Sequence, residues 1–231
     1  MKSTLRFAAL MSAGGGFLDS FSWVAHGHVF TNAQTGNIIL FGVFAAKDDW
    51  QQALRHVPPM LAFFPGIFMA QWLCKRSFVD DPLRATAVSL GIEMAILTVV
   101  GLLSSAFPDM VAVFAIAFAA AMQNSGFEHV GKWSYTSVVT TGNLGSLGEA
   151  FFAVMFSPSK PEASDQARAL ATVCVSFVCG AIAGATLTAS FGKFAIVFPI
   201  ILLSFGFLSR FWEARVRAGT GLPSSGGPID R

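Results

Sequence analysis

A Thr-Gly-Asn tripeptide occurs twice in this chain, and its residues are the best candidates for binding a solute. The six residues are Thr35, Gly36, Asn37, Thr141, Gly142 and Asn143. Thr and Asn are favoured at helix N-termini, and Gly lets another group approach the backbone closely. Helix starts also carry unpaired N–H groups, so two of them could bind an anionic or carbonyl-bearing solute. The alternative is that the Thr and Asn side chains only cap and join helices.

Acidic side chains inside apolar stretches form the second set of candidates. Asp19 lies in the middle of the first apolar run, and Glu93 and Glu149 lie in later ones. A carboxylate at membrane depth is costly, so it usually faces a cavity or a partner. We therefore predict that Asp19 binds the solute or a coupling ion, with a structural role as the alternative. Glu149 is a further candidate, although its charge opposes an anion at the second tripeptide.

No metal site, cofactor site or catalytic residue is predicted. Cys74, Cys174 and Cys179 lie in apolar stretches and form no Cys-x-x-Cys pair, which favours a role in helix contacts. His26 and His28 could ligate a metal, but no cysteine or carboxylate cluster joins them at a suitable spacing. We interpret the histidine pair as a polar turn at the membrane interface.

The composition requires a lipid environment for most of the chain. Of 231 residues, 54% are hydrophobic and 12% are charged, and the mean hydropathy is +0.61. An average soluble domain has about 25% charged residues. A soluble fold of this size could not cover so much apolar surface. The net charge of +2 gives no reason to expect a nucleic-acid partner.

Six apolar runs are long enough to cross a bilayer, which takes roughly 20 residues. They are 7–29, 57–74, 86–106, 110–127, 168–191 and 194–212. Two further segments, 31–46 and 137–156, begin polar and become apolar. Each is either a short crossing helix or a re-entrant helix that enters and leaves on one side.

The distribution of Lys and Arg favours the re-entrant interpretation, because cytoplasmic loops carry an excess of these residues. With six spans, three of the fifteen Lys and Arg residues lie on the periplasmic side of the membrane. With eight spans, five of them lie there. We therefore predict six spans plus two re-entrant or short tripeptide helices, and keep eight spans as the alternative. Lys47 and Lys193 should then face the periplasm, whereas Lys75, Lys160 and the C-terminus should face the cytoplasm.

The chain reads as two copies of one pattern, about 7–106 and 110–212. Each copy has a polar residue ahead of its tripeptide and a later helix with small residues at a spacing of four. The matching positions are Asp19 with Asn124, and Gly66/Ala70 with Gly180/Gly184. Three crossings per copy would invert the second copy, as in many secondary transporters. A duplication that only builds a stable bundle is the alternative.

We predict one transmembrane domain over residues 1–217 and a disordered tail over 218–231, because the tail is rich in Gly, Pro and Ser. Residues 157–168 are predicted to form a polar loop within the domain.

The motifs resemble those of a known family. Gly-Phe-Leu-Asp-Ser-Phe-Ser at 16–22 and the segment 29–37 look like its first-half pattern, Gly-x-x-Asp-x-x-Ser followed by Phe-x-x-x-x-Thr-Gly-Asn. Ala-Met-Gln-Asn at 121–124 and Thr-Thr-Gly-Asn at 140–143 are similar to its second-half signature. This is the YoaK-like family of small bacterial membrane proteins, a domain of unknown function. The resemblance implies a multi-pass protein of the bacterial inner membrane and supplies no activity.

These observations predict an all-α membrane protein that acts as a small secondary transporter or a channel-like protein. The unidentified small solute would bind at the two tripeptides, with Asp19, Asn124 and Glu149 as further binding residues. Six spans are few for a transporter, so a homodimer is also considered. The rivals are an enzyme that uses Asp19, Glu149 and His26 on a lipid, and a scaffold without catalysis. A cavity lined by both copies would favour transport, and a site open to lipid from one copy would favour an enzyme.

Overall fold

The computed structural model describes residues 2–77, 82–103, 108–126, 129–130, 133–134, 140–156 and 162–220. In chain order its helices are α1 (Lys2–Ala25), α2 (Gln34–Ala45), α3 (Trp50–Arg55), α4 (Val57–Trp72), α5 (Pro82–Leu103), α6 (Asp109–Gly126), α7 (Thr140–Phe156), α8 (Glu162–Phe191) and α9 (Val197–Thr220). The shorter elements are a π-helical turn η1 (Leu73–Ser77), a 3-10 turn η2 (Gly192–Ile196), and two antiparallel strands, β1 (His129–Val130) and β2 (Trp133–Ser134).

Local sequence explains several of the helix boundaries. The chain turns with positive φ at Gly27 (+82°), just after α1, and at Gly192 (+58°), directly after α8. Glycine is the usual residue for such helix C-termini. The predicted polar loop 157–168 is shorter than expected, because α8 already begins at Glu162. Glu162 and Asp165 lie in the first turn of α8, where negative charge favours a helix N-terminus.

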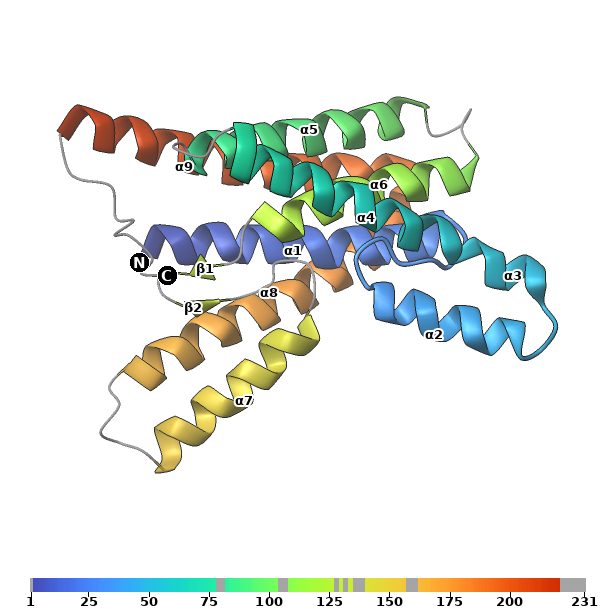
Figure 1. Cartoon of the computed structure of the whole chain (residues 1–231), viewed down its shortest axis with the longest axis horizontal. Coiled ribbons are helices and arrows are strands. Elements are labelled where there is room, and N and C mark those ends of the chain that lie inside the picture. The colour runs from blue at the N-terminus through green and yellow to red at the C-terminus, as the bar shows by residue number, and fades with distance from the viewer. Residues whose placement is uncertain are drawn as a thin grey trace.

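The long helices run back and forth along one axis of the molecule (Figure 1). Helices α1 and α6 run in opposite directions, as do α4 and α8, and α5 and α9. The two helices that carry the tripeptides, α2 and α7, both begin near the middle of the molecule and run outward in different directions. Helix α2 ends at the same end of the molecule as α1.

Helix α1 forms the centre of the apolar core. Its side chains Phe7, Met11, Phe17, Leu18 and Phe21 are buried against residues of α5, α6, η2 and α9. Ser12 Oγ donates a hydrogen bond to the Val173 carbonyl of α8 at 2.9 Å. The most extensive helix contacts are α1 with α8 and α4 with α6.

Both of these contacts depend on glycine. A Cβ atom at Gly180 of α8 would clash with the carbonyl oxygen of Ala13 in α1. A Cβ atom at Gly66 of α4 would clash with the carbonyl oxygen of Phe118 in α6. Small residues allow such close approach of two helix backbones. The small residues Gly66 and Gly180 are therefore used for helix contacts within one chain.

Large apolar side chains cover much of the outer surface. Phe64 and Phe68 of α4, Leu102 of α5 and Phe194 of η2 are each 73% to 78% exposed. A soluble monomer rarely exposes so many large apolar side chains together, whereas lipid tails accept them. The predicted helical membrane protein is thus confirmed in its coarse features.

Within the described residues, three segments are long and apolar enough to cross a membrane. They are Trp50–Arg76, Ala85–Leu102 and Glu162–Ser209, the last of which contains both α8 and α9. Asp109–Gln123 and Gln34–Ala45 are shorter apolar helices. Helix α1 is not among these segments, and many of its side chains are buried against other helices of the protein. The number of spans stays a prediction, and Lys160 lies outside the described residues, as do 221–231 of the predicted tail.

Candidate functional site

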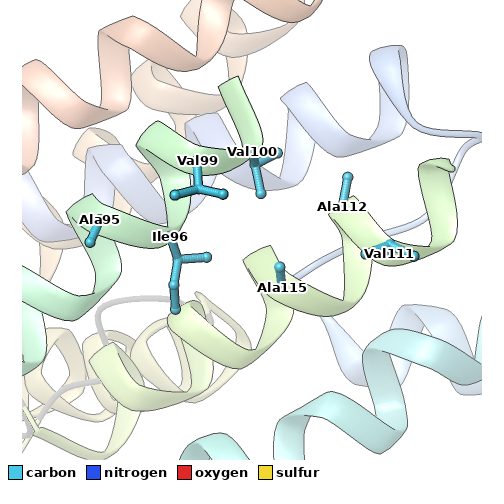
Figure 2. A pocket seen from close by; sticks show the side chains of 7 residues that line it. All are labelled: Ala95, Ile96, Val99, Val100, Val111, Ala112 and Ala115. Carbon is cyan, nitrogen blue, oxygen red and sulfur yellow. The ribbon is translucent and has the colours of Figure 1, made fainter. Parts of the chain in front are cut away.

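A groove and a cavity of the protein differ in the polarity of their lining side chains. A groove of about 280 Å³ between α5 and α6 has only apolar side chains, as Figure 2 shows. They are Ala95, Ile96, Val99, Val100, Val111, Ala112 and Ala115. The other hollow, of about 590 Å³, is lined by polar and aromatic residues from both halves of the chain. We call it the TGN cavity, and its polar side chains are Asp19, Ser20, Asn32, Gln34, Thr35, Thr140 and Thr141.

Asp19 holds the segment that leads into α2. Its Oδ1 accepts hydrogen bonds from the backbone N–H groups of Thr31 at 3.0 Å and Asn32 at 2.7 Å. The Asn32 side chain in turn donates from Nδ2 to the Gly15 carbonyl oxygen at 2.9 Å. A carboxylate beside a helix start is favourable because the helix dipole is positive there. Asp19 therefore ties the start of α2 to the C-terminal third of α1 and also lines the TGN cavity.

Asn37 is enclosed by the protein and its polar atoms are occupied. Its Nδ2 donates to the Phe30 carbonyl oxygen at 2.7 Å and to Gln34 Oε1 at 3.0 Å. Its Oδ1 accepts the Phe30 N–H at 3.1 Å and lies 3.2 Å from His56 Nδ1. These bonds fix the first turn of α2 against the preceding loop. Asn37 does not line the TGN cavity.

The structure brings together only part of the predicted binding set. Asp19, Thr35, Gly36 and Thr141 line the TGN cavity. The predicted residues that do not line it are Asn37, Gly142, Asn143 and Glu149, of which Asn143 is buried and Gly142 and Glu149 are exposed. The side chain of Asn124 lies outside the described part of the structure.

Several lining residues were missed by the sequence analysis. Phe63 and Phe177 line the TGN cavity from α4 and α8. Each stands three residues before a close-contact glycine, Gly66 or Gly180, so the repeat itself carried a signal for them. Asn32 and Thr140 carried a weaker signal: Thr140 directly precedes the second tripeptide, and Asn32 lies three residues before the first.

A second polar cluster joins three helix ends. His26 Nδ1 lies 2.9 Å from Asp109 Oδ1, and Lys193 Nζ donates to the same oxygen at 3.0 Å. His26 follows α1, Asp109 begins α6 and Lys193 lies in η2. The sequence predicts a polar turn at His26 but carries no local signal for either partner. A cavity of about 450 Å³ adjoins His26, Arg55 and Asp109.

The charge state of His26 follows from its surroundings. Burial lowers the pKa of His26 by more than its hydrogen bond with Asp109 raises it. Its Nε2 is buried with no partner among the described residues, so a proton there would be left unpaired. Partial burial raises the pKa of Asp109, but hydrogen bonds from Lys193 and His26 outweigh this and lower it. The folded protein therefore favours neutral His26 and ionised Asp109.

We expect the folded state to lose stability as the pH falls below about 6.5, the ordinary pKa of histidine. The unfolded chain binds a proton at His26 in that range, whereas the folded chain resists it because its pKa is lower. Thermal unfolding of the detergent-solubilised protein at a series of pH values measures the effect. His26→Gln should reduce the acid-induced fall in Tm.

His28→Asn is the matched control, because His28 is exposed and its positive φ of 61° is one that Asn tolerates. This variant should keep the full acid-induced fall. An unchanged pH profile in His26→Gln would contradict the assignment.

The chemistry that the TGN cavity offers is hydrogen bonding to a small polar molecule. Backbone N–H groups of Thr35 and Gly36 lie in the first turn of α2, where no earlier helical carbonyl can accept them. Side-chain oxygens of Asn32 and Thr140 add acceptors. Within the described residues, no group of three His, Cys, Asp or Glu side chains gathers at a spacing that could hold a metal.

Comparison with known proteins gives the family of the chain. The chain is 27% identical over 201 residues to the UPF0700 transmembrane protein YoaK of Bacillus subtilis (strain 168). The aligned region covers 84% of this chain and 88% of that protein. No solved structure matches the chain significantly. A family profile described as "Protein of unknown function (DUF1275)" matches residues 7–209. Since that match spans most of the chain, the protein belongs to the DUF1275 family of unknown function.

Proposed function

We propose that this chain is a small secondary transporter of the bacterial inner membrane, with one multi-pass domain over residues 1–217. An unidentified small solute would bind in the TGN cavity. One observation carries the proposal: Thr35 at the start of α2 and Thr141 at the start of α7 line the same cavity. Two broken helices that meet at a polar cavity are a recurring transporter feature.

A pair of inverted repeats is supported by equivalent contacts. In the proposed alignment, α1 matches α6 and α4 matches α8, so the α1–α8 contact is the counterpart of the α4–α6 contact. The glycine contacts agree in detail. Gly180 meets the Ala13 carbonyl, six residues before Asp19, and Gly66 meets the Phe118 carbonyl, six residues before Asn124. Matching helices also run in opposite directions (Figure 1), as inversion requires.

Six spans with two re-entrant helices fit this arrangement better than eight spans. Helix α2 begins near the middle of the molecule and leaves at the end where α1 finishes (Figure 1). The segment from Ala25 to Ala45 would therefore enter and leave the membrane on one side. Lys47 would then lie on the same side as Lys193, as the distribution of basic residues predicts.

The rival enzyme receives less support from the positions of its residues. Asp19 lines the TGN cavity, His26 pairs with Asp109 at the helix ends, and Glu149 is exposed on α7 away from the cavity lining. An enzyme that used all three on one lipid would need them together. A cavity lined by both halves of the chain favours transport over a site built from one half.

Cross-linking tests the shared cavity. We would replace all three native cysteines with alanine and introduce Thr35→Cys with Thr141→Cys. A short bifunctional thiol reagent should join the pair in membranes. Ile39→Cys with Thr141→Cys is the control, since Ile39 lies one turn further along α2, is 59% exposed and does not line the cavity. Equal cross-linking of both pairs, or of neither, would count against a central site.

A further inference from the structure

Two side-chain oxygens of residues that line the TGN cavity have no hydrogen-bond partner among the described residues. Asn32 Oδ1 and Thr140 Oγ1 are buried and have no hydrogen-bond partner among the described residues. Asn32 is only 1% exposed, and its Nδ2 is already bonded to the Gly15 carbonyl. A buried polar atom without a partner is unfavourable, and a bound donor removes that penalty. Both oxygens belong to residues that line the cavity. The amide oxygen of Asn32 can only accept a hydrogen bond, and the Thr140 hydroxyl can accept one as well as donate one, so an occupant that donates hydrogen bonds would satisfy both.

The charges around the TGN cavity favour a cation. Asp19 is acidic, and none of the described lining residues is Lys, Arg or His. The starts of α2 and α7 oppose a cation, since each helix N-terminus carries about half a positive charge. At α2 this is offset by Asp19, whose Oδ1 accepts the N–H groups of Thr31 and Asn32 just before the helix. An anion would meet the Asp19 carboxylate without a basic side chain to pair with.

The aromatic part of the lining has the same preference. Phe30, Phe63 and Phe177 contribute to the cavity wall. The face of an aromatic ring attracts ammonium groups and does not attract carboxylates. Phenylalanine also excludes water, which strengthens the interaction between a bound charge and its partners.

We infer that the TGN cavity recognises the protonated amine of a small organic solute, with the ammonium group donating to Asn32 Oδ1 and Thr140 Oγ1. This inference rests on the proposed function and names the solute class of the same site. Simple amines and zwitterionic amino acids share this group. It replaces the anion or carbonyl compound that the tripeptides alone predicted.

Thermal shift of the purified full-length protein in detergent tests the inference with three compounds of similar size. Isoamylamine carries only the ammonium group, L-leucine carries an ammonium and a carboxylate, and N-acetyl-L-leucine lacks the ammonium. We expect a concentration-dependent rise in Tm with isoamylamine, with L-leucine, or with both, and none with N-acetyl-L-leucine. A rise with the first alone indicates simple amines, and a rise that is stronger with the second indicates amino acids.

Thr140→Val removes one acceptor and keeps the shape of the side chain. The affinity for the amine that binds should fall about tenfold, as expected for a lost hydrogen bond to a charged group. Thr140→Ser keeps the hydroxyl and should bind like the unmodified protein. Thr188→Val is the matched control, because Thr188 Oγ1 in α8 is also buried without a described partner but does not line the cavity.

The inference is overturned if neither amine binds, if N-acetyl-L-leucine binds as tightly as the amines, or if Thr140→Val and Thr188→Val have equal effects. The cross-link between positions 35 and 141 distinguishes a failure of the ammonium assignment from a failure of the proposed site. If the cross-link forms and no amine binds, the shared cavity stands and the ammonium assignment falls. If the cross-link does not form, the proposed site falls as well.

Discussion

Gly180→Leu should leave little folded protein, because α8 can no longer approach α1. The added side chain would meet the Ala13 carbonyl oxygen, which belongs to a helix backbone and cannot rotate away. Overpacking of a protein interior typically costs about 1 to 3 kcal/mol. We expect at least the upper end of that range here, because the most extensive helix contact of the chain would have to open. Fluorescence-detected size exclusion after heating measures the loss.

Two variants give this prediction its controls. Gly148→Leu on α7 places the same side chain at an exposed position with open space around it, so the Tm should change little. Gly66→Leu should resemble Gly180→Leu, because a Cβ atom at Gly66 would meet the Phe118 carbonyl in the equivalent contact. If Gly180→Leu were as stable as Gly148→Leu, the close contact between α1 and α8 would be wrong.

Asp19→Ala should destabilise the protein strongly by releasing the segment before α2. Two backbone N–H groups, those of Thr31 and Asn32, would lose their acceptor while still buried. An unsatisfied buried donor costs about 1 to 3 kcal/mol, so the pair corresponds to about 2 to 6 kcal/mol. Asp19→Asn keeps one acceptor oxygen and should cost less. Thermal unfolding in detergent measures the stability, and thiol labelling of Thr31→Cys reports whether the segment has opened.

Asp49→Ala provides the comparison for Asp19. Asp49 accepts the Gln52 N–H at 3.1 Å and caps α3, but it is exposed to the surroundings. Loss of an exposed helix cap costs about 1 kcal/mol. If Asp19→Ala and Asp49→Ala lowered the Tm equally, Asp19 would not be the buried anchor described above.

The apolar runs predicted the long helices well. A segment that contacts lipid must satisfy its backbone N–H and C=O groups by internal hydrogen bonds, and it must stay apolar over the thickness of the bilayer. The run at 57–74 became α4 and η1, and the run at 86–106 became the larger part of α5. Short or polar elements were harder to predict. Helix α3 has six residues and no apolar periodicity to mark it. The first turns of α8 are polar, so the sequence predicted a loop where the helix already begins.

The candidate site could be predicted only where the repeat marked it. Asp19, Thr35 and Thr141 stood out because polar residues recurred in matching apolar contexts. The bonding of Asn37 to Phe30 and Gln34 could not be seen, since it depends on how the chain folds back before α2. Nor could the pairing of His26 with Asp109, because 83 residues separate them and no local pattern connects them.

The central claim is transport through a cavity shared by two inverted repeats, and labelling of Thr141→Cys from each side of the membrane tests it most directly. The protein would carry no other cysteine, and a membrane-impermeant thiol reagent would be applied to right-side-out and to inside-out vesicles. The account predicts labelling from both sides, because a cavity between inverted repeats opens to each side in turn. Lys47→Cys, in the loop between α2 and α3, should be labelled from one side only. Labelling of Thr141→Cys from a single side would contradict the transporter account.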